Sequence, residues 1–284
     1  MKTHLAASEL VLNPDGSVYH LNLHPEDIAH KIILVGDPDR VEKVSAFFDK
    51  IEVRKNKREF YTHTGILRGE RITVMSSGIG TENIDIVMNE LDALVNIDLR
   101  NKVIKDQHTS LELFRIGTCG SVNPEIEVDN MLVSENVVGL DGLMHFYSDY
   151  QFENAFSRSF LEGFPYEKIR SMLYFAQGDS SMKAYYSDAT YHGNTATFPG
   201  FYAPQGRELR LRSVDDRFLE TLNSLGVSNF EMETSAIYAL SHLLGHKAIT
   251  VNNVIANRRR GEFSSDHHAS EKKMISWVLE RIIK

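Results

Sequence analysis

Short apolar runs rich in β-branched residues alternate with amphipathic stretches along the whole chain. The first two runs, Lys31–Val35 and Arg71–Ser76, are each followed by apolar residues at helical spacing, over Arg40–Phe48 and after Thr81. Strands that alternate with helices usually form one sheet whose faces the helices cover. We therefore expect an α/β protein with a largely internal sheet.

The remaining elements follow the same alternation. Strands are predicted at Leu111–Ile116, Met131–Val138, Met172–Ala176 and Ala248–Val254, and helices at Asp216–Leu225, Met232–Leu244 and Asp266–Ile283. Thr81 is expected to N-cap the helix that follows it. Residues 97–110 and 178–200 are polar and irregular, so we expect both to be surface insertions. No linker or repeat interrupts the chain, which predicts a single domain over residues 1–284 with an N-terminal extension at 1–17.

Composition excludes several classes of protein. The chain has 284 residues, 42% hydrophobic and 25% charged, which is typical of a globular protein with a substantial core. No apolar run is long enough to span a membrane, and the N-terminus turns polar too soon for a secretory signal. The single cysteine, Cys119, can form no internal disulfide and fits a reducing cytoplasm. The net charge of −8 argues against a nucleic-acid surface, so a few arginines must hold any bound anion.

Two segments have the residues of an anion site. Residues 114–120, Phe-Arg-Ile-Gly-Thr-Cys-Gly, are predicted to deliver Arg115 and Thr118 from a strand to a glycine-lined loop. A guanidinium offers a fork of donors, and glycine lets backbone N–H groups approach an anion closely. Gly36 and Arg40 lie in a second such segment, between a strand and a helix, where α/β sheets bind ligands. The alternative for this second segment is a proline-containing turn with no ligand.

Two later segments suit a nucleoside. The segment Phe201–Arg207 combines an aromatic ring with Gln205 and Arg207, which together complement an imide edge such as that of uracil. The alternative is a surface loop with an exposed arginine. Glu233, beside Met232, has the chemistry to accept hydrogen bonds from a ribose diol, although acids in a first helical turn often only complement the helix dipole.

Other site classes find little support. Ser77-Gly78-Ile79-Gly80 lacks the third glycine of a dinucleotide fingerprint and is better explained as a tight turn. The histidines have no metal-ligand spacing, and no G-x-S-x-G nucleophile elbow is present. Arg58 and Glu59, considered alone, are typical of a solvated surface pair.

Taken together, the motifs resemble the nucleoside phosphorylase family, and within it the uridine phosphorylase branch, over most of residues 18–284. The resemblance rests on the stretches Val18–Leu21, Val35–Val41, Arg58–Phe60, Ser77–Gly80, Arg115–Thr118, Phe201–Arg207 and Phe230–Glu233. It implies a single-domain mixed β-sheet with a distorted, barrel-like core flanked by α-helices.

The resemblance also implies roles for individual residues. Phosphate would be bound by Gly36, Arg40, Arg58, Arg115 and Thr118. Ribose would be bound by His20, Glu231, Met232 and Glu233. The base would be bound by Phe201, Gln205, Arg207 and Arg258. The residues closest to the chemistry would be Arg115, Thr118, Arg207 and Glu233. Arg58 and His20 would act in a neighbouring subunit's site, which makes the protein a homo-oligomer.

The implied reaction is the reversible phosphorolysis of uridine, or of deoxyuridine or thymidine, to uracil and a pentose 1-phosphate. Such a pentosyltransferase would act in cytoplasmic pyrimidine salvage, with no nucleic-acid or membrane partner. Phosphate is a co-substrate and no cofactor is expected, apart from a monovalent cation such as potassium near Glu59, Ile79 and Asn83. Asn83 stands where relatives carry serine.

Three alternatives remain open at this point. The first is a purine nucleoside phosphorylase, although purine-specific relatives carry an aspartate where this chain has Asn257 and Arg258. The second is a nucleosidase that needs no phosphate and hence no set of three arginines. The third is a nucleoside-binding sensor without catalysis.

Overall fold

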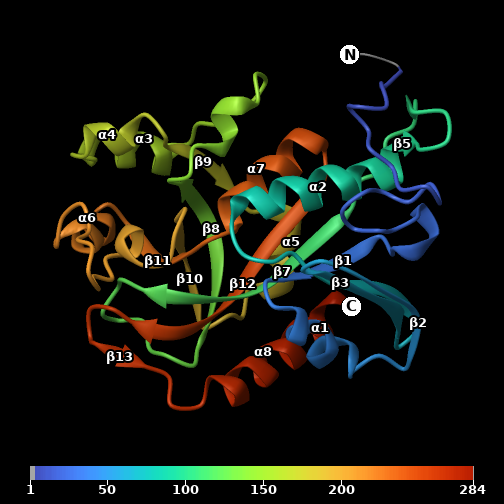
Figure 1. Ribbon diagram of the computed structural model, residues 1–284. Helices are drawn as coiled ribbons and strands as arrows, with labels where there is room; N and C mark the ends of the chain where they lie inside the picture. The colour runs from blue at the N-terminus through green and yellow to red at the C-terminus, as the bar shows by residue number, and fades with distance from the viewer. Residues whose placement is uncertain (1–3, 284) are drawn as a thin grey trace.

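An eleven-stranded sheet runs through the molecule, and helices lie on both of its faces (Figure 1). The computed structural model describes residues 4–283. The strand order is β13-β12-β8-β10-β11-β7-β1-β4-β3-β2, and β9 pairs with β8. A separate two-stranded hairpin is formed by β5 and β6.

The elements have the following bounds. The strands are β1 (Lys31–Val35), β2 (Lys50–Lys57), β3 (Phe60–Leu67), β4 (Glu70–Ser76), β5 (Ile97–Asp98), β6 (Val103–Ile104), β7 (Glu112–Ser121), β8 (Met131–Gly139), β9 (Tyr174–Gln177), β10 (Tyr191–Thr197), β11 (Val227–Glu231), β12 (Lys247–Asn257) and β13 (Glu262–Phe263). The α-helices are α1 (Pro38–Ser45), α2 (Thr81–Asn96), α3 (Ala155–Gly163), α4 (Glu167–Arg170), α5 (Ser180–Lys183), α6 (Phe218–Ser224), α7 (Thr234–Leu244) and α8 (His267–Ile282). Short 3-10 helices are η1 (Pro25–Asp27), η2 (Leu143–Phe146), η3 (Ala184–Tyr186) and η4 (Ala203–Gln205).

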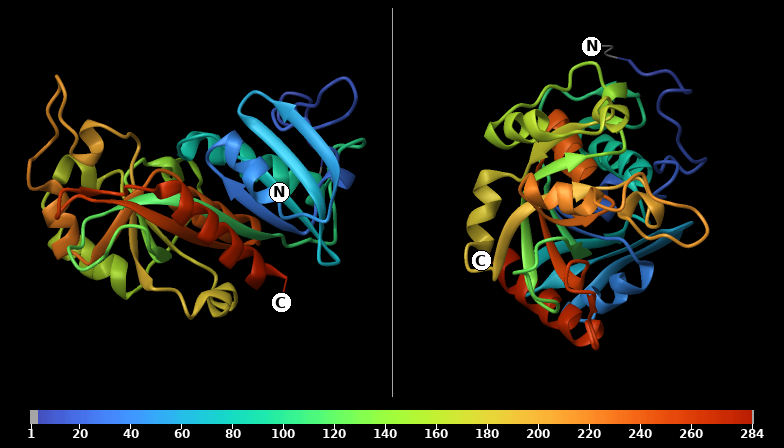
Figure 2. Two further views of the ribbon diagram at one scale, coloured as in Figure 1. Left: turned by 90° about the horizontal axis from the view of Figure 1, so that it is seen from below. Right: turned by 90° about the vertical axis from the view of Figure 1, so that its left-hand side faces the viewer.

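Part of this sheet closes on itself. β7 pairs with β12 in parallel, β12 with β8 antiparallel, β8 with β10 and β10 with β11 in parallel, and β11 returns antiparallel to β7. These five strands form a small barrel, from which β1, β4, β3 and β2 extend as an open sheet (Figure 2). The expected mixed sheet with a distorted, barrel-like core is confirmed.

β7 is the strand at which the open sheet and the barrel meet. Its first half pairs with β1, up to the partners Val35 and Ile116, whereas Gly120 and Ser121 pair with β11 on the same edge. Residues 117–119 lie between these two stretches and pair with neither β1 nor β11. Because neighbouring strands diverge there, this is a switch point of the kind at which α/β sheets bind ligands.

Alternating side chains of β1 explain why its sequence is continuously apolar. Ile32 and Leu34 belong to the hydrophobic core completed by α2 and α7, whereas Ile33 and Val35 belong to the core completed by α1 and α8. A strand that is buried on both faces needs apolar side chains at every position. Among the described residues, no helix is long and apolar enough to cross a membrane.

Most predicted elements are confirmed, with three corrections to where elements begin and end. The loop expected after Ile116 does not exist, because pairing with β12 keeps β7 extended to Ser121. Thr81 is the first residue of α2 and not its N-cap, which is Gly80 with φ of 97°. Similarly, α7 begins at Thr234 and not at Met232, with Glu233 as its N-cap residue.

The proposed insertions differ from one another. Residues 97–110 lie mostly at the surface, where they contain the β5–β6 hairpin. The surface assignment of 178–200 is wrong in both halves, because Met182 and Tyr186 are buried in the core and Tyr191–Thr197 form β10 between β8 and β11. This strand contains Gly193, Asn194 and two threonines, so its sequence lacks the apolar pattern of a buried strand. Of the extension predicted over 1–17, Leu10 and Ser17 are buried; residues 1–3 lie outside the described part.

Candidate active site

A cavity of about 680 Å³ opens where β1 and β11 diverge along β7. Its walls come from the ends of β1, β7, β11 and β12, from the turn before α2, and from the loop around η4. The lining residues are Gly36, Asp37, Pro38, Arg40, Glu59, Gly78, Ile79, Asn83, Arg115, Thr118, Cys119, Gly120, Phe201, Gln205, Arg207, Phe230, Glu231, Met232, Glu233, Ile255, Ala256 and Phe263. Segments far apart in the sequence therefore meet in one cavity.

Four of the five residues predicted to bind phosphate lie at this cavity. Gly36 follows β1, Arg40 lies in α1, and Arg115 and Thr118 lie on β7. Arg40 is mostly buried and donates from Nε to the carboxylate of Glu271, which lies on α8. The guanidinium of Arg115 lies close to the backbone of β7 at Gly117. A side chain does not fit there, because a Cβ on Gly117 would lie 2.3 Å from Nη1 of Arg115.

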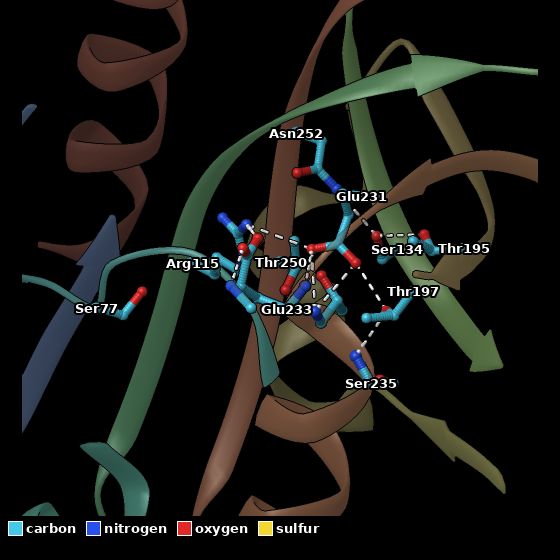
Figure 3. A network of polar contacts seen from close by, with 12 residues as sticks. Ser77, Arg115, Ser134, Thr195, Thr197, Glu231, Glu233, Ser235, Thr250 and Asn252 are labelled. Carbon is cyan, nitrogen blue, oxygen red and sulfur yellow. Dashed lines mark hydrogen bonds and ion pairs between the residues drawn. The ribbon is translucent and has the colours of Figure 1, made fainter. Parts of the chain in front are cut away.

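Arg115 lies in a buried charge cluster with two acids (Figure 3). Its Nη2 contacts the carboxylate of Glu233 and lies 3.3 Å from Oε2 of Glu231. Although burial favours a neutral group, Glu233 and then Glu231 keep the pKa of the Arg115 guanidinium above its ordinary value. The cluster thus fixes a permanent cation at the floor of the cavity.

The two acids differ in how many donors they accept. Glu231 accepts hydrogen bonds from the Thr197 hydroxyl at 2.7 Å and from the backbone N–H groups of Glu233 and Thr234 at the start of α7 (Figure 3). Glu233 accepts one backbone hydrogen bond, from Gly80 at 2.8 Å, in addition to its contact with Arg115. A carboxylate has about four lone-pair positions, so Glu233 keeps acceptor capacity for a ligand whereas Glu231 mainly holds the start of α7.

The residues predicted to bind the base form a second wall. Arg207 donates to Oε1 of Gln205 at 2.5 Å and to the backbone carbonyl of Phe201 at 2.8 Å, and its guanidinium lies 3.8 Å from the centre of the Phe201 ring. Burial, and then the nearby charge of Arg258, lower the pKa of Arg207. A partly buried guanidinium with only neutral partners favours an additional acceptor from a ligand.

Arg258 does not line the cavity. It donates to the backbone carbonyls of Gln205 at 3.2 Å and Gly206 at 3.0 Å, so it supports the loop that carries Gln205 and Arg207. Its predecessor Asn257 donates to the carbonyls of Asn123 and Ile126 at 2.9 and 2.8 Å. The amide of Asn257 is therefore committed to the protein backbone.

Two predicted residues lie away from the cavity of their own chain. Arg58 is exposed at the tip of the β2–β3 hairpin, with φ of 55°. His20 is half-buried, and its Nδ1 lies 2.6 Å from Oε1 of Glu90 on α2. Neither residue lines the cavity, and the resemblance implies that both would act in the site of another subunit.

The three residues expected to flank a monovalent cation lie together at the cavity wall. Glu59 and Asn83 both lie close to Gly78, since a Cβ there would lie 3.0 and 2.4 Å from their nearest side-chain atoms. The Asn83 amide donates to the carbonyl of Ile79 at 3.4 Å, and Ile79 is 70% exposed. The group offers oxygen atoms, which is the ligand type that such an ion needs.

The roles of several residues that line or support the cavity are not evident in the sequence. Gly80 acts through its backbone N–H, which no motif reveals. Glu271 lies in the polar pattern of α8, and nothing in that pattern indicates a partner on α1. Ile255 and Ala256 lie on β12 beyond Val254, where the predicted strand ended.

Folding also brings together Asp92, His108 and His246, whose ligand atoms lie within 4.8 Å of one another. The buried Nδ1 of His246 accepts the backbone N–H of Leu111 at 3.2 Å. With Nδ1 engaged by the backbone, Nε2 of His246 lies 3.3 Å from Oδ1 of Asp92. This group is consequently better suited to a histidine–carboxylate contact than to a metal ion.

The family model described as the phosphorylase superfamily matches residues 30–284. A uridine phosphorylase of Thermococcus kodakarensis is 29% identical over 263 residues, which cover 91% of this chain and 83% of that protein. The solved structure of a Trypanosoma brucei nucleoside phosphorylase that shows uridine phosphorylase activity matches with a TM-score of 0.87 and 28% identity, over 96% of this chain and 99% of that one. A purine nucleoside phosphorylase of Oceanobacillus iheyensis is 25% identical over 273 residues, or 93% of this chain and 99% of that protein.

Proposed function

The chain belongs to the phosphorylase superfamily, and we propose that it is a uridine phosphorylase, a pentosyltransferase that splits uridine with phosphate into uracil and ribose 1-phosphate. One observation supports this proposal more strongly than any other. A single cavity joins two mostly buried arginines, a buried acid with free acceptor capacity, and an amide–guanidinium pair beside an aromatic ring. These are the three chemistries that phosphate, ribose and a pyrimidine base require.

Phosphate is assigned to the end of the cavity formed by β1, α1 and β7. Arg40 and Arg115 supply cationic donors, Thr118 a hydroxyl and Gly36 a backbone N–H. Arg58 of a neighbouring subunit would add a third cation, which makes the active form a homo-oligomer with shared sites. A binding site with several arginines is suited to a dianion even in a chain whose net charge is −8.

Ribose is assigned to the middle of the cavity. Glu233 would accept hydrogen bonds from the sugar hydroxyls, with Met232 packed beside the ring and Glu231 holding the backbone that positions both. His20 from the neighbouring subunit would reach the 5′-hydroxyl. The base is assigned to Phe201, Gln205 and Arg207, with Arg258 supporting their loop.

The chemistry follows from these positions. A phosphate oxygen attacks C1′ as the glycosidic bond breaks, and the bonding electrons leave with the uracil ring. Arg207 and Gln205 would stabilise the negative charge that develops on the ring, while the phosphate's charge stabilises the oxocarbenium-like sugar. The site needs no nucleophilic side chain, because the reaction is accelerated mainly by positioning and by preorganised charge.

A purine substrate is the second candidate, since purine nucleoside phosphorylases are among the relatives. The strand end at which purine-specific relatives carry an acid here presents Ile255 and Ala256 to the cavity. The Asn257 amide faces the backbone of the β7–β8 connection instead. This wall offers no acid to a purine ring, which favours a pyrimidine.

Two further expectations belong to this proposal. A monovalent cation such as potassium would bind near Glu59, Ile79 and Asn83, and no other cofactor is required. The protein would act in the cytoplasm, in keeping with its one cysteine, which is buried and forms no disulfide.

The test is cleavage of uridine, thymidine and inosine, followed by ultraviolet absorbance with and without phosphate. Uridine cleavage that depends on phosphate supports the proposal. Cleavage without phosphate would identify a nucleosidase, and preference for inosine would identify a purine enzyme. Binding of uridine and phosphate without turnover would identify a sensor.

A further inference from the structure

We infer that Glu271, on the C-terminal helix α8, is a positioning residue for phosphate, which acts by orienting the guanidinium of Arg40. The inference rests on the proposed phosphate site and extends it by a residue that no sequence motif indicates. Glu271 itself does not line the cavity, so it does not touch the substrate there.

The contact has a specific geometry. Nε of Arg40 donates to Oε1 of Glu271, and Nη1 makes only a long contact of 3.5 Å with the carbonyl of Ile116. Within residues 4–283, Nη2 of Arg40 has no hydrogen bond to the protein. Glu271 therefore holds the guanidinium of Arg40 through Nε and leaves the two terminal nitrogens, Nη1 and Nη2, for an anion in the cavity.

Glu271 is itself held from a second side. Its Oε2 accepts a hydrogen bond from Lys43 at 2.6 Å, and Lys43 lies one helical turn after Arg40 on α1. The carboxylate is only 6% exposed, so its position is restricted by packing as well as by its two cations. Arg40, Lys43 and Glu271 carry one net positive charge, which keeps the region attractive to phosphate despite the added acid.

Orientation before binding has a direct effect on affinity. An arginine side chain that is free to rotate loses conformational entropy when it binds an anion, whereas a preoriented one has already lost it. Without Glu271, Arg40 would adopt several rotamers and would hold phosphate in only some of them. We expect the Michaelis constant for phosphate to rise about tenfold, with that for uridine nearly unchanged.

Two substitutions separate orientation from charge. Glu271→Gln keeps an oxygen that can accept a hydrogen bond from Nε of Arg40, so the Michaelis constant for phosphate should change less than about threefold. Glu271→Leu removes the acceptor and should give the tenfold rise. If the acid acts only through its charge, both substitutions remove a repulsion and lower the constant, and that result would overturn the inference.

A double-mutant cycle tests the route through Arg40. In the Arg40→Met background, Glu271→Leu should cause no further rise in the phosphate constant, because its effect requires the guanidinium. An equal rise in both backgrounds contradicts the inference. The matched control is Glu280→Leu, which removes an exposed acid from the same helix and should leave the phosphate constant unchanged.

A second measurement needs no turnover. Phosphate should raise the melting temperature of the wild-type protein and of Glu271→Gln, and should raise it much less for Glu271→Leu. If the chain binds phosphate but does not cleave uridine, this difference still supports the inference while the proposed function fails. If Glu271→Leu melts at a lower temperature but responds to phosphate as the wild type does, Glu271 is only structural.

Discussion

The guanidinium of Arg115 contacts the carboxylate of Glu233, although 118 residues separate them in the chain. The cation proposed to hold phosphate and the acid proposed to hold ribose are thus bonded to one another, and the two substrate sites are not independent. A change at either residue should alter the binding of both substrates.

Glu233→Gln should therefore act in opposite directions on the two substrates. Loss of the charged acceptor should lower kcat/KM for uridine about a hundredfold. The Michaelis constant for phosphate should fall, because Arg115 loses its strongest competitor for the anion. Initial rates measured while the concentrations of both substrates are varied give the two effects. An unchanged or higher Michaelis constant for phosphate would refute the coupling.

Arg207→Ala should affect the base alone. Removing the guanidinium deprives both the developing charge on uracil and the Gln205 amide of a partner, so kcat for uridine should fall about a hundredfold. The phosphate constant should stay near its wild-type value. Arg210→Ala, an exposed arginine on the same loop, is the control and should behave as wild type; equal losses in the two variants would contradict the assignment.

Mixed oligomers test whether Arg58 acts in a neighbour's site. Arg58→Ala and Arg207→Ala should each be poorly active, since each damages every site. When the two variants are unfolded and refolded together, some sites combine an intact Arg207 with an intact neighbouring Arg58, and up to about a quarter of full activity should return. If mixing restores nothing although hybrids form, Arg58 does not act across the subunit boundary.

Cys119 should be inert in the folded protein. It is buried, and burial raises the pKa of its thiol to about 12, so almost no reactive thiolate forms near neutral pH. Ellman's reagent should detect one thiol per chain in guanidinium chloride and almost none under native conditions. Rapid labelling of the native protein would show that the β7 segment opens to solvent.

The pH dependence of stability should report the pairing of Glu271. Burial alone would raise the pKa of its carboxyl, but Arg40 and Lys43 outweigh burial and hold the pKa below its ordinary value of 4.5. A lowered folded-state pKa contributes stability above the unfolded pKa, and this stability is lost as the pH falls through the folded value. Urea unfolding should find the wild type more stable than Glu271→Gln near neutral pH, and the difference should shrink below pH 4.5. A difference that does not depend on pH would exclude the charged pair as its source.

The sequence predicted the strands whose side chains are apolar on both faces. β1, β4 and β12 were located because short runs rich in apolar and β-branched residues are a local property of the chain. β10 was missed because its small and polar residues pack inside a closed barrel, where Thr195 bonds to Ser134 and Asn229. Only neighbouring strands make such a segment favourable as a buried strand.

The candidate site divides in the same way. Residue types within short motifs indicated the chemistry of phosphate, sugar and base, because donors, acceptors and rings are carried by the residues themselves. Their meeting in one cavity depends on the divergence of β1 and β11 along β7, which no local pattern contains. The tertiary structure alone decided that Arg58 and His20 lie outside this cavity and that Glu271 holds Arg40 across 231 residues of sequence. Hydrophobic periodicity and motif chemistry are properties of residues that are close in sequence. The partner of a buried charge, in contrast, depends on which distant segments the fold packs against it when it is removed from water.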